Sequence, residues 1–149
     1  MSQEGTSIDL ATSLGYLLKE TSAALRSAME AVLRPLGMSV THYSCLELLA
    51  HRPGLSNSDL ARGAFVTRQS MNVLLKALEE DGIITRPQEP AVGRVLPTSL
   101  TDRGRRQLAQ ASAAVKGVED RMGAELTTPE KDHLRSLLKR CVSSLGEAS

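Results

Sequence analysis

The stretch VTRQSMNVLLKALEEDG, residues 66–82, decides the fold of this chain. Its apolar side chains recur at the i, i+3, i+4 and i+7 positions that line one side of a helix. These side chains are Met71, Leu74, Leu75 and Leu78. Thr67 precedes the run as a helix N-cap, and Gly82 ends it. The stretch predicts an amphipathic helix that buries one face in a core.

The opposite face of this helix carries groups that can form hydrogen bonds. Its positions near the N-terminus, outside the apolar stripe, are Arg68, Gln69, Ser70, Asn72, Val73 and Lys76. Acidic side chains follow only at the end of the helix, in Glu79, Glu80 and Asp81. This distribution predicts that the N-terminal half of the helix meets a polar partner.

A shorter helix is expected just upstream. The segment LSNSDLARGA, residues 55–64, has Ser56 as N-cap and Asp59 three residues later, which is a capping-box arrangement. Only residues 65–66 separate this helix from the cap of the next one. Two helices joined by so short a turn form a helix-turn-helix candidate.

A hairpin is predicted directly downstream. Two short β-favouring runs, IITRPQ and RVLPTSL, flank the loop EPAVG, so the hairpin tip would hold Gly93 and Arg94. Pro97 in the second run restricts that strand to a sheet edge. A hairpin at this place makes the winged form of the helix-turn-helix motif.

Long helices are expected on both sides of this unit. Residues 9–34 read as one helix ended by Pro35 and Gly37, and Thr41 is the expected cap of a second helix. On the far side, Thr101 and Thr128 are the expected caps of two more helices, the latter with Pro129 in its first turn. The last helix carries a packing seam of Leu134, Leu138, Cys141 and Leu145.

The sequence therefore predicts one mainly α-helical domain with a small β-hairpin wing. Residues 40–100 would form the winged helix-turn-helix unit, and residues 1–39 and 101–149 would form dimerisation helices. The first helix and the last two cannot all cover so small a unit. We therefore expect them to pack against a second copy of the chain in a two-fold dimer.

Composition sets further limits. A chain of 149 residues with 41% hydrophobic and 23% charged residues is typical of a soluble globular domain. One Phe, two Tyr and no Trp imply an aliphatic core. The sequence lacks a signal peptide and an apolar run of membrane-spanning length, so we expect a cytoplasmic protein without a membrane partner.

Charge distribution fits a nucleic-acid partner better than the net charge of +1 does. Eight Lys or Arg face five Asp or Glu over residues 62–106, so the middle of the chain is basic and its flanks are slightly acidic. A helix presented by a helix-turn-helix fits the major groove of DNA. The partner that we expect is therefore a double-stranded DNA operator.

The residue types on the predicted recognition helix suit base contacts. Gln69 and Asn72 can offer amides to adenine, and Arg68 can reach guanine or phosphate. Val73 can touch a thymine methyl, whereas Thr67 and Lys76 can hold phosphates. In the wing, Arg94 would approach a minor groove and read its width.

With these elements in place, the chain resembles the MarR family of bacterial transcriptional regulators over nearly its whole length. The specific pieces are LEEDGIITR and the spacing from Arg94 to LTDRG. The resemblance implies a winged-helix homodimer that represses genes until a small molecule or an oxidant releases it. Two positions depart from the family pattern. Val92 stands where the wing usually has an acidic residue, and Val73 stands where an arginine is frequent.

The resemblance also implies an effector site. Family members often bind small aromatic acids or phenols between the dimerisation helices and the winged unit. Here Tyr16, Arg26, Val40, His42 and Leu46 offer an apolar wall, a hydroxyl, a cation and a titratable donor. The alternative is that these residues serve packing or lie on a solvated surface.

Other chemistry has little support in the sequence. The three histidines share no metal-ligand spacing with Cys45 and Cys141, so we expect no metal, no cofactor and two cysteines that act as small core hydrophobes. Gly93 and Gly104 belong to turns or caps rather than to a phosphate loop, and no catalytic triad is visible, so we expect no catalytic residues and no enzyme. Two alternatives stay open: a winged-helix module that binds protein, and a repressor that senses oxidants through Cys141.

Overall fold

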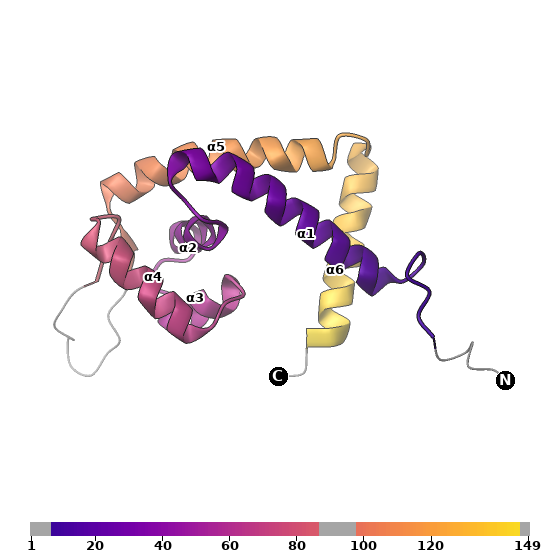
Figure 1. The fold of residues 1–149 in the computed structure, drawn as a ribbon, viewed down its shortest axis with the longest axis horizontal. Coiled ribbons are helices and arrows are strands. Elements are labelled where there is room, and N and C mark those ends of the chain that lie inside the picture. Colours follow the sequence, from indigo (N-terminus) through magenta and orange to yellow (C-terminus); the bar gives the residue numbers. More distant parts are fainter. Residues whose placement is uncertain (1–6, 87–97, 147–149) are drawn as a thin grey trace. The chain divides into compact units, whose positions relative to one another are not determined.

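The computed structural model describes residues 7–86 and 98–146 of the chain. In this part the fold is mainly helical, with one small antiparallel sheet (Figure 1). The chain forms two compact units, residues 1–115 and 116–149. No helix in the described residues is long and apolar enough to cross a membrane.

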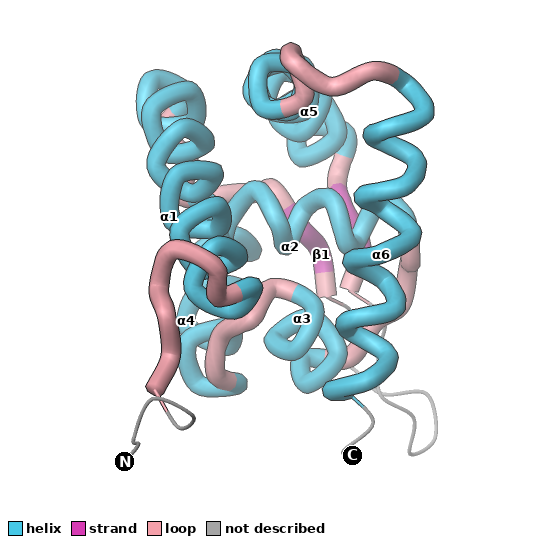
Figure 2. The backbone as a smooth tube through the Cα atoms, turned by 90° about the vertical axis from the view of Figure 1, so that its right-hand side faces the viewer, coloured by secondary structure: helices cyan, strands magenta, loops and turns pink. Residues whose placement is uncertain are grey.

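The first unit holds the predicted helix-turn-helix and the base of the hairpin. Its elements are α1 (Leu14–Leu33), the 3-10 helix η2 (Arg34–Leu36), α2 (Val40–His51), α3 (Asn57–Gly63), α4 (Arg68–Glu80), β1 (Ile84–Thr85), β2 (Ser99–Leu100) and most of α5 (Asp102–Met122). The strands pair with Ile84 opposite Leu100, and the sheet lies beside α2 (Figure 2). The predicted tip with Gly93 and Arg94, and Pro97, lie outside the described residues.

An aliphatic core joins these elements, as the composition predicts. Its fully buried side chains are Leu33, Cys45, Leu46, Leu60, Met71, Leu75 and Ile84. They come from α1, α2, α3, α4 and β1. Only the C-terminal end of α1 enters this core, because Leu14 and Leu18 at its other end are exposed. The expected apolar stripe of α1 is therefore buried over part of its length.

Two helix starts in the first unit differ from those expected. Helix α1 begins at Leu14 with Ser13 as its cap, because Asp9 instead closes a separate turn through its carbonyl and carboxylate. Helix α2 is capped by Ser39 and not by Thr41, since the Ser39 hydroxyl accepts the backbone N–H of His42 at 3.0 Å. In α2 one good capping residue thus replaces another two positions away, and in α1 the helix starts five residues later than expected.

The second unit contains the end of α5 and helix α6 (Thr128–Gly146). Thr127, and not Thr128, caps α6. Its hydroxyl accepts the N–H of Glu130, and the Glu130 carboxylate accepts the N–H of Thr127, which is a complete capping box. Every described residue of α6 is exposed in the single chain, including its predicted seam. The expectation that Cys141 is a core residue is therefore wrong for the isolated chain.

Close contact fixes the start of α5 against the segment after α4. The hydroxyl of Thr101 donates to the carbonyl oxygens of Gly82 at 2.7 Å and Ile83 at 3.0 Å, and it accepts the N–H of Gly104 at 3.0 Å. Thr101 is thus the predicted cap. A Cβ at Gly104 would lie 2.2 Å from the carbonyl oxygen of Ile83. Gly104 is therefore a site of close approach inside α5 and not a turn or cap residue.

A polar contact joins α5 to α2. Nε2 of His42 lies 3.0 Å from Oε1 of Gln107. Further along the same pair of helices, the Glu47 carboxylate accepts hydrogen bonds from Tyr43 and from Ser112, the latter at 3.0 Å. Burial lowers the pKa of His42, and this effect exceeds the opposing influences of the Gln107 hydrogen bond and the charge of Asp81.

We expect Gly104→Ala to lower the free energy of unfolding by about 1–3 kcal/mol, because the new methyl group overpacks the Ile83 carbonyl. Gly117→Ala in the same helix is the matched control. No described atom beyond its own helix lies within 4 Å of a Cβ there, so this change should raise stability by up to about 1 kcal/mol. Urea unfolding of both variants tests the pair. Equal effects at the two positions would contradict the close approach.

We expect the protein to lose stability as the pH falls through the ordinary His42 pKa of 6.5. The folded state binds this proton less readily than the unfolded state, so acidification favours unfolding. The variant His42→Gln should lose this part of the pH dependence, whereas His133→Gln on the exposed face of α6 should keep it. Thermal unfolding between about pH 7.5 and pH 5.5 is the measurement. An unchanged slope in His42→Gln would refute the assignment.

Candidate nucleic-acid interface

Helix α4 packs against α3 and the core through one face. Met71 and Leu75 are fully buried and Leu78 is 2% exposed, as their spacing predicts. Leu74 is half-buried at the edge of the same face. This packing fixes which side of α4 faces outward.

The turn between α3 and α4 places the start of α4 at the surface. Thr67 caps α4 as predicted, since its hydroxyl accepts the N–H of Ser70 at 3.0 Å. The same hydroxyl donates to the Ser70 side chain at 3.0 Å. The hydroxyls of Thr67 and Ser70 thus form one exposed polar pair at the first turn of α4.

The structure brings seven of the eight predicted DNA contacts onto one exposed surface. These are Thr67, Arg68, Gln69, Ser70, Asn72, Val73 and Lys76, and we call them the α4 outer face. Val73 is 67% exposed, so it offers an aliphatic surface among these polar side chains. The eighth residue, Arg94, lies outside the described residues.

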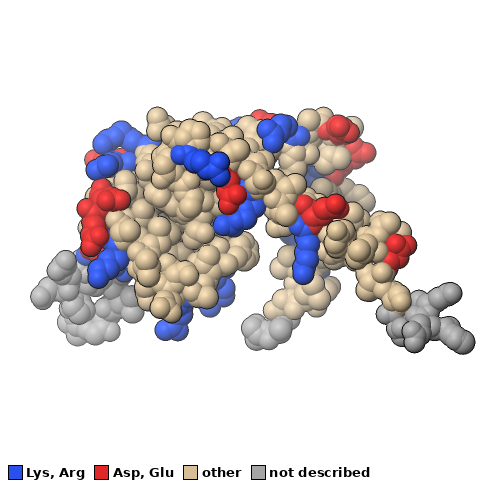
Figure 3. Space-filling model, in the orientation of Figure 1, with Lys and Arg blue, Asp and Glu red and all other residues tan. Residues whose placement is uncertain are grey.

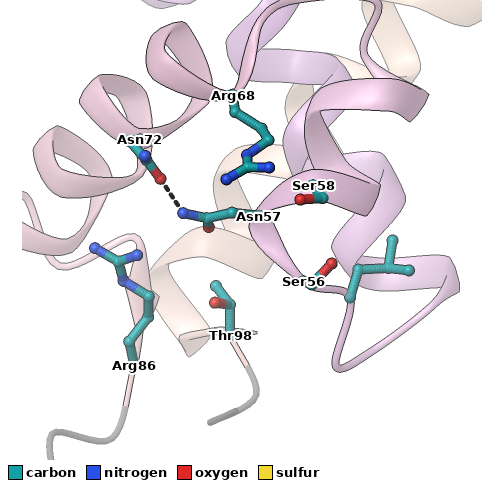
Figure 4. A pocket seen from close by; sticks show the side chains of 8 residues that line it. Ser56, Asn57, Ser58, Arg68, Asn72, Arg86 and Thr98 are labelled. Atoms are coloured by element: carbon teal, nitrogen blue, oxygen red, sulfur yellow. Dashed lines mark hydrogen bonds between the residues drawn. The ribbon is translucent and has the colours of Figure 1, made fainter.

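A hydrogen bond across the two helices fixes the amide of Asn72. Nδ2 of Asn57, the first residue of α3, donates to Oδ1 of Asn72 (Figure 4). This bond occupies part of the acceptor capacity of Asn72 and leaves its Nδ2 donors available. Within the described residues no hydrogen bond of the Gln69 side chain is recorded. The two amides therefore differ in what they can offer a base.

A polar cavity of about 320 Å³ lies beside this hydrogen bond. It is lined by Leu55, Ser56, Asn57, Ser58, Arg68, Asn72, Arg86 and Thr98. Figure 4 shows the guanidinium groups of Arg68 and Arg86 approaching the Asn57–Asn72 pair from two sides. The cavity thus combines two cations with amide and hydroxyl groups, which is the chemistry that phosphate oxygens recognise.

Charges along α4 are segregated. Nη2 of Arg86 lies 3.4 Å from Oε1 of Glu79, so one acid near the C-terminal end of α4 is already paired. The described residues provide no ion pair for Arg68 or Lys76. Figure 3 shows basic side chains on the part of the surface that α3 and α4 form, and acidic side chains at one edge of that part. The positive charge available to a partner is therefore near the start and middle of α4.

Sequence reasoning missed Asn57, Arg86 and Thr98 at this site. Periodicity finds the outer face of one helix, but Asn57 reaches the site from α3, Arg86 from just after β1 and Thr98 from just before β2. Asn57 lies in the first turn of α3. In the sequence, this position in the first helix of the helix-turn-helix candidate is the only sign that Asn57 belongs to the site.

The five residues assigned to an effector do not form one small site within a single chain. Tyr16 and Arg26 stand about 15 Å apart along α1, given a rise of about 1.5 Å per residue, so one small aromatic ring cannot reach both. Arg26 lies 3.5 Å from the Glu30 carboxylate. On α2, Val40 and His42 are half-buried and Leu46 is fully buried.

The two cysteines differ in environment. Cys45 is buried, and burial raises the pKa of its thiol to about 12, so this thiol is held in its unreactive form. Cys141 is exposed on α6. Among the described residues, no three His, Cys, Asp or Glu side chains are grouped to hold a metal ion.

Comparison with known proteins agrees with this geometry. The model of the MarR family matches residues 36–95. The HTH-type transcriptional repressor Rv2887 of Mycobacterium tuberculosis is 42% identical over 127 residues, which are 85% of this chain and 91% of that protein.

Solved structures of the same mycobacterial protein superpose on this chain. Its complex with DNA gives a TM-score of 0.72 at 39% identity, and the alignment covers 87% of this chain and 98% of the mycobacterial chain. Its complex with salicylic acid gives a TM-score of 0.74 at 41% identity and covers 87% of this chain and 96% of that one. With this similarity over most of both chains, the protein belongs to the MarR family of transcriptional regulators.

Proposed function

We propose that this protein is a dimeric, ligand-responsive transcriptional repressor that binds an operator through the α4 outer face. The observation that carries the proposal is the division of α4 into a buried apolar face and an exposed face of donors, acceptors and cations. A related repressor of the same fold has been solved in complex with DNA, which supports this use of the surface.

The side chains of the outer face divide into base readers and phosphate binders. Gln69 has the geometry for a bidentate contact with adenine, and Asn72 can donate to an acceptor such as N7 or O4. Val73 suits a thymine methyl, while Lys76 and the Thr67–Ser70 pair suit phosphates. Arg68 and Arg86 would hold a phosphate at the cavity between α3 and α4, and Arg94 would follow a minor groove.

Exposed apolar faces support a homodimer. On α1 they comprise Leu14, Tyr16, Leu17 and Leu18, and on α6 they comprise Leu134, Leu137, Leu138, Val142 and Leu145. Contiguous apolar patches of this kind on single chains mark association surfaces. A two-fold dimer would place two α4 helices about one DNA turn, roughly 34 Å, apart on a near-palindromic site.

In this proposal residues 40–100 bind DNA and the flanking segments 1–39 and 101–149 hold the dimer together. The protein acts in the cytoplasm as a regulator and not as an enzyme. The relatives that match it are named transcriptional repressors and regulators, which supports that assignment.

We expect Gln69→Ala and Asn72→Ala each to cost about 1–3 kcal/mol of binding free energy on an operator selected from random duplexes, and little on unselected DNA. Lys76→Ala should weaken binding to both DNAs and reduce the salt slope by about one, because it removes a phosphate contact. Fluorescence anisotropy titrations at several salt concentrations measure both effects. Equal losses on both DNAs for the two amide variants would show that they do not read bases. A salt-independent interaction would instead favour a protein-binding module.

We expect a salicylate-like acid to bind free protein more tightly than operator-bound protein, and to weaken operator affinity by the same factor. A relative has been solved with salicylic acid, which motivates the choice of probe. If Arg26 pairs with the carboxylate, Arg26→Gln should lose salicylate affinity and Lys19→Gln on the same helix should not. Calorimetric titration of both forms is the measurement. Equal salicylate affinities of free and operator-bound protein would mean that the salicylate site does not control DNA binding.

A further inference from the structure

Phe65 lies in the turn between α3 and α4, and the residue is 92% exposed. It is the only Phe in the chain. An aromatic side chain normally contributes to a core or an interface, because its burial removes a large apolar area from water. The core of the first unit makes no such use of Phe65, so its exposure calls for another partner.

The backbone at Phe65 is strained. Its φ of 61° lies in the left-handed region, where the other described residues with positive φ are Gly37, Gly54 and Gly82. The N–H of Phe65 bonds to the carbonyl of Arg62 at 3.2 Å, and the N–H of Val66 bonds to that of Ala61 at 3.0 Å. These are the bonds of a Schellman motif, whose left-handed position usually holds Gly.

A glycine at this position would cap α3 equally well and would relieve the strain. The protein instead retains a bulky residue where the backbone disfavours it and where the chain itself does not bury it. Strain of this kind concentrates at functional sites. The turn is also well placed, since Phe65 precedes the α4 cap Thr67 by two residues and so adjoins the first turn of the outer face.

We propose that Phe65 is a DNA-contacting residue, whose ring packs against an apolar part of the duplex beside the first turn of α4. This inference rests on the proposed use of the α4 outer face. The apolar groups that B-DNA offers there are deoxyribose and the thymine methyl group. Because the ring is uncharged, it adds affinity without adding a released counterion.

The test uses three full-length variants. Phe65→Gly should raise the midpoint of thermal unfolding by about 2–4 °C, because the strain is relieved, and should weaken DNA binding about tenfold, because the ring is lost. Phe65→Ala should weaken binding equally without the gain in thermal stability. Phe65→Tyr should retain the affinity of the unmodified protein. In all three variants the slope of affinity against salt should stay unchanged.

Comparing the operator with unselected DNA distinguishes contact with a thymine methyl group from contact with deoxyribose. A loss on the operator alone assigns the ring to a thymine methyl group, and an equal loss on unselected DNA assigns it to deoxyribose. The inference would be overturned if Phe65→Gly and Phe65→Ala bound DNA like the unmodified protein. It would also be overturned if these variants lost the dimer in sedimentation, because the ring would then contact a second copy of the chain.

Lys76→Ala distinguishes this failure from a failure of the proposed function. If Lys76→Ala weakens DNA binding while the Phe65 variants do not, the inference on Phe65 alone is wrong. If neither change affects DNA binding, the α4 outer face is not the DNA-binding surface and both proposals fail.

Discussion

Burial of Met71, Leu75 and Leu78 against α3 and the core is the interaction on which the rest of the structure depends. Truncating one such side chain in a well-packed core costs about 2–5 kcal/mol, so rotation of α4 about its axis is strongly disfavoured. The same packing turns the polar outer face to solvent. The apolar residues of α4 thus determine which polar residues a partner can meet.

Two features refine this arrangement beyond helix packing. The hydrogen bond from Asn57 holds the Asn72 amide in one orientation, so α3 influences what α4 presents. The turn at Phe65 keeps a left-handed backbone that costs about 1–2 kcal/mol for a residue other than Gly. The hydrogen bond defines the surface, and the turn keeps its conformation at a cost in stability. This balance is the one expected where a rigid helix pair must match a groove of fixed shape.

Periodicity and capping chemistry were sufficient to predict the helix-turn-helix, the base of the hairpin and the residues of the outer face. They placed two caps wrongly, because Ser39 and Thr127 each lie within two residues of another residue that can cap a helix, and the three-dimensional turn selects between them. They also missed Asn57 and Arg86. A residue that reaches a site from another element leaves no periodic signal, since its partner is fixed by how the elements cross and not by spacing along the chain.

The central claim is that α3 aims the outer face of α4 at DNA bases. A double-mutant cycle on operator affinity with Asn57→Ala, Asn72→Ala and the double variant tests it most directly. The account predicts that Asn57→Ala weakens operator binding several-fold when Asn72 is present and has almost no further effect in the Asn72→Ala background. Independent, additive losses, or no loss from Asn57→Ala alone, would contradict it.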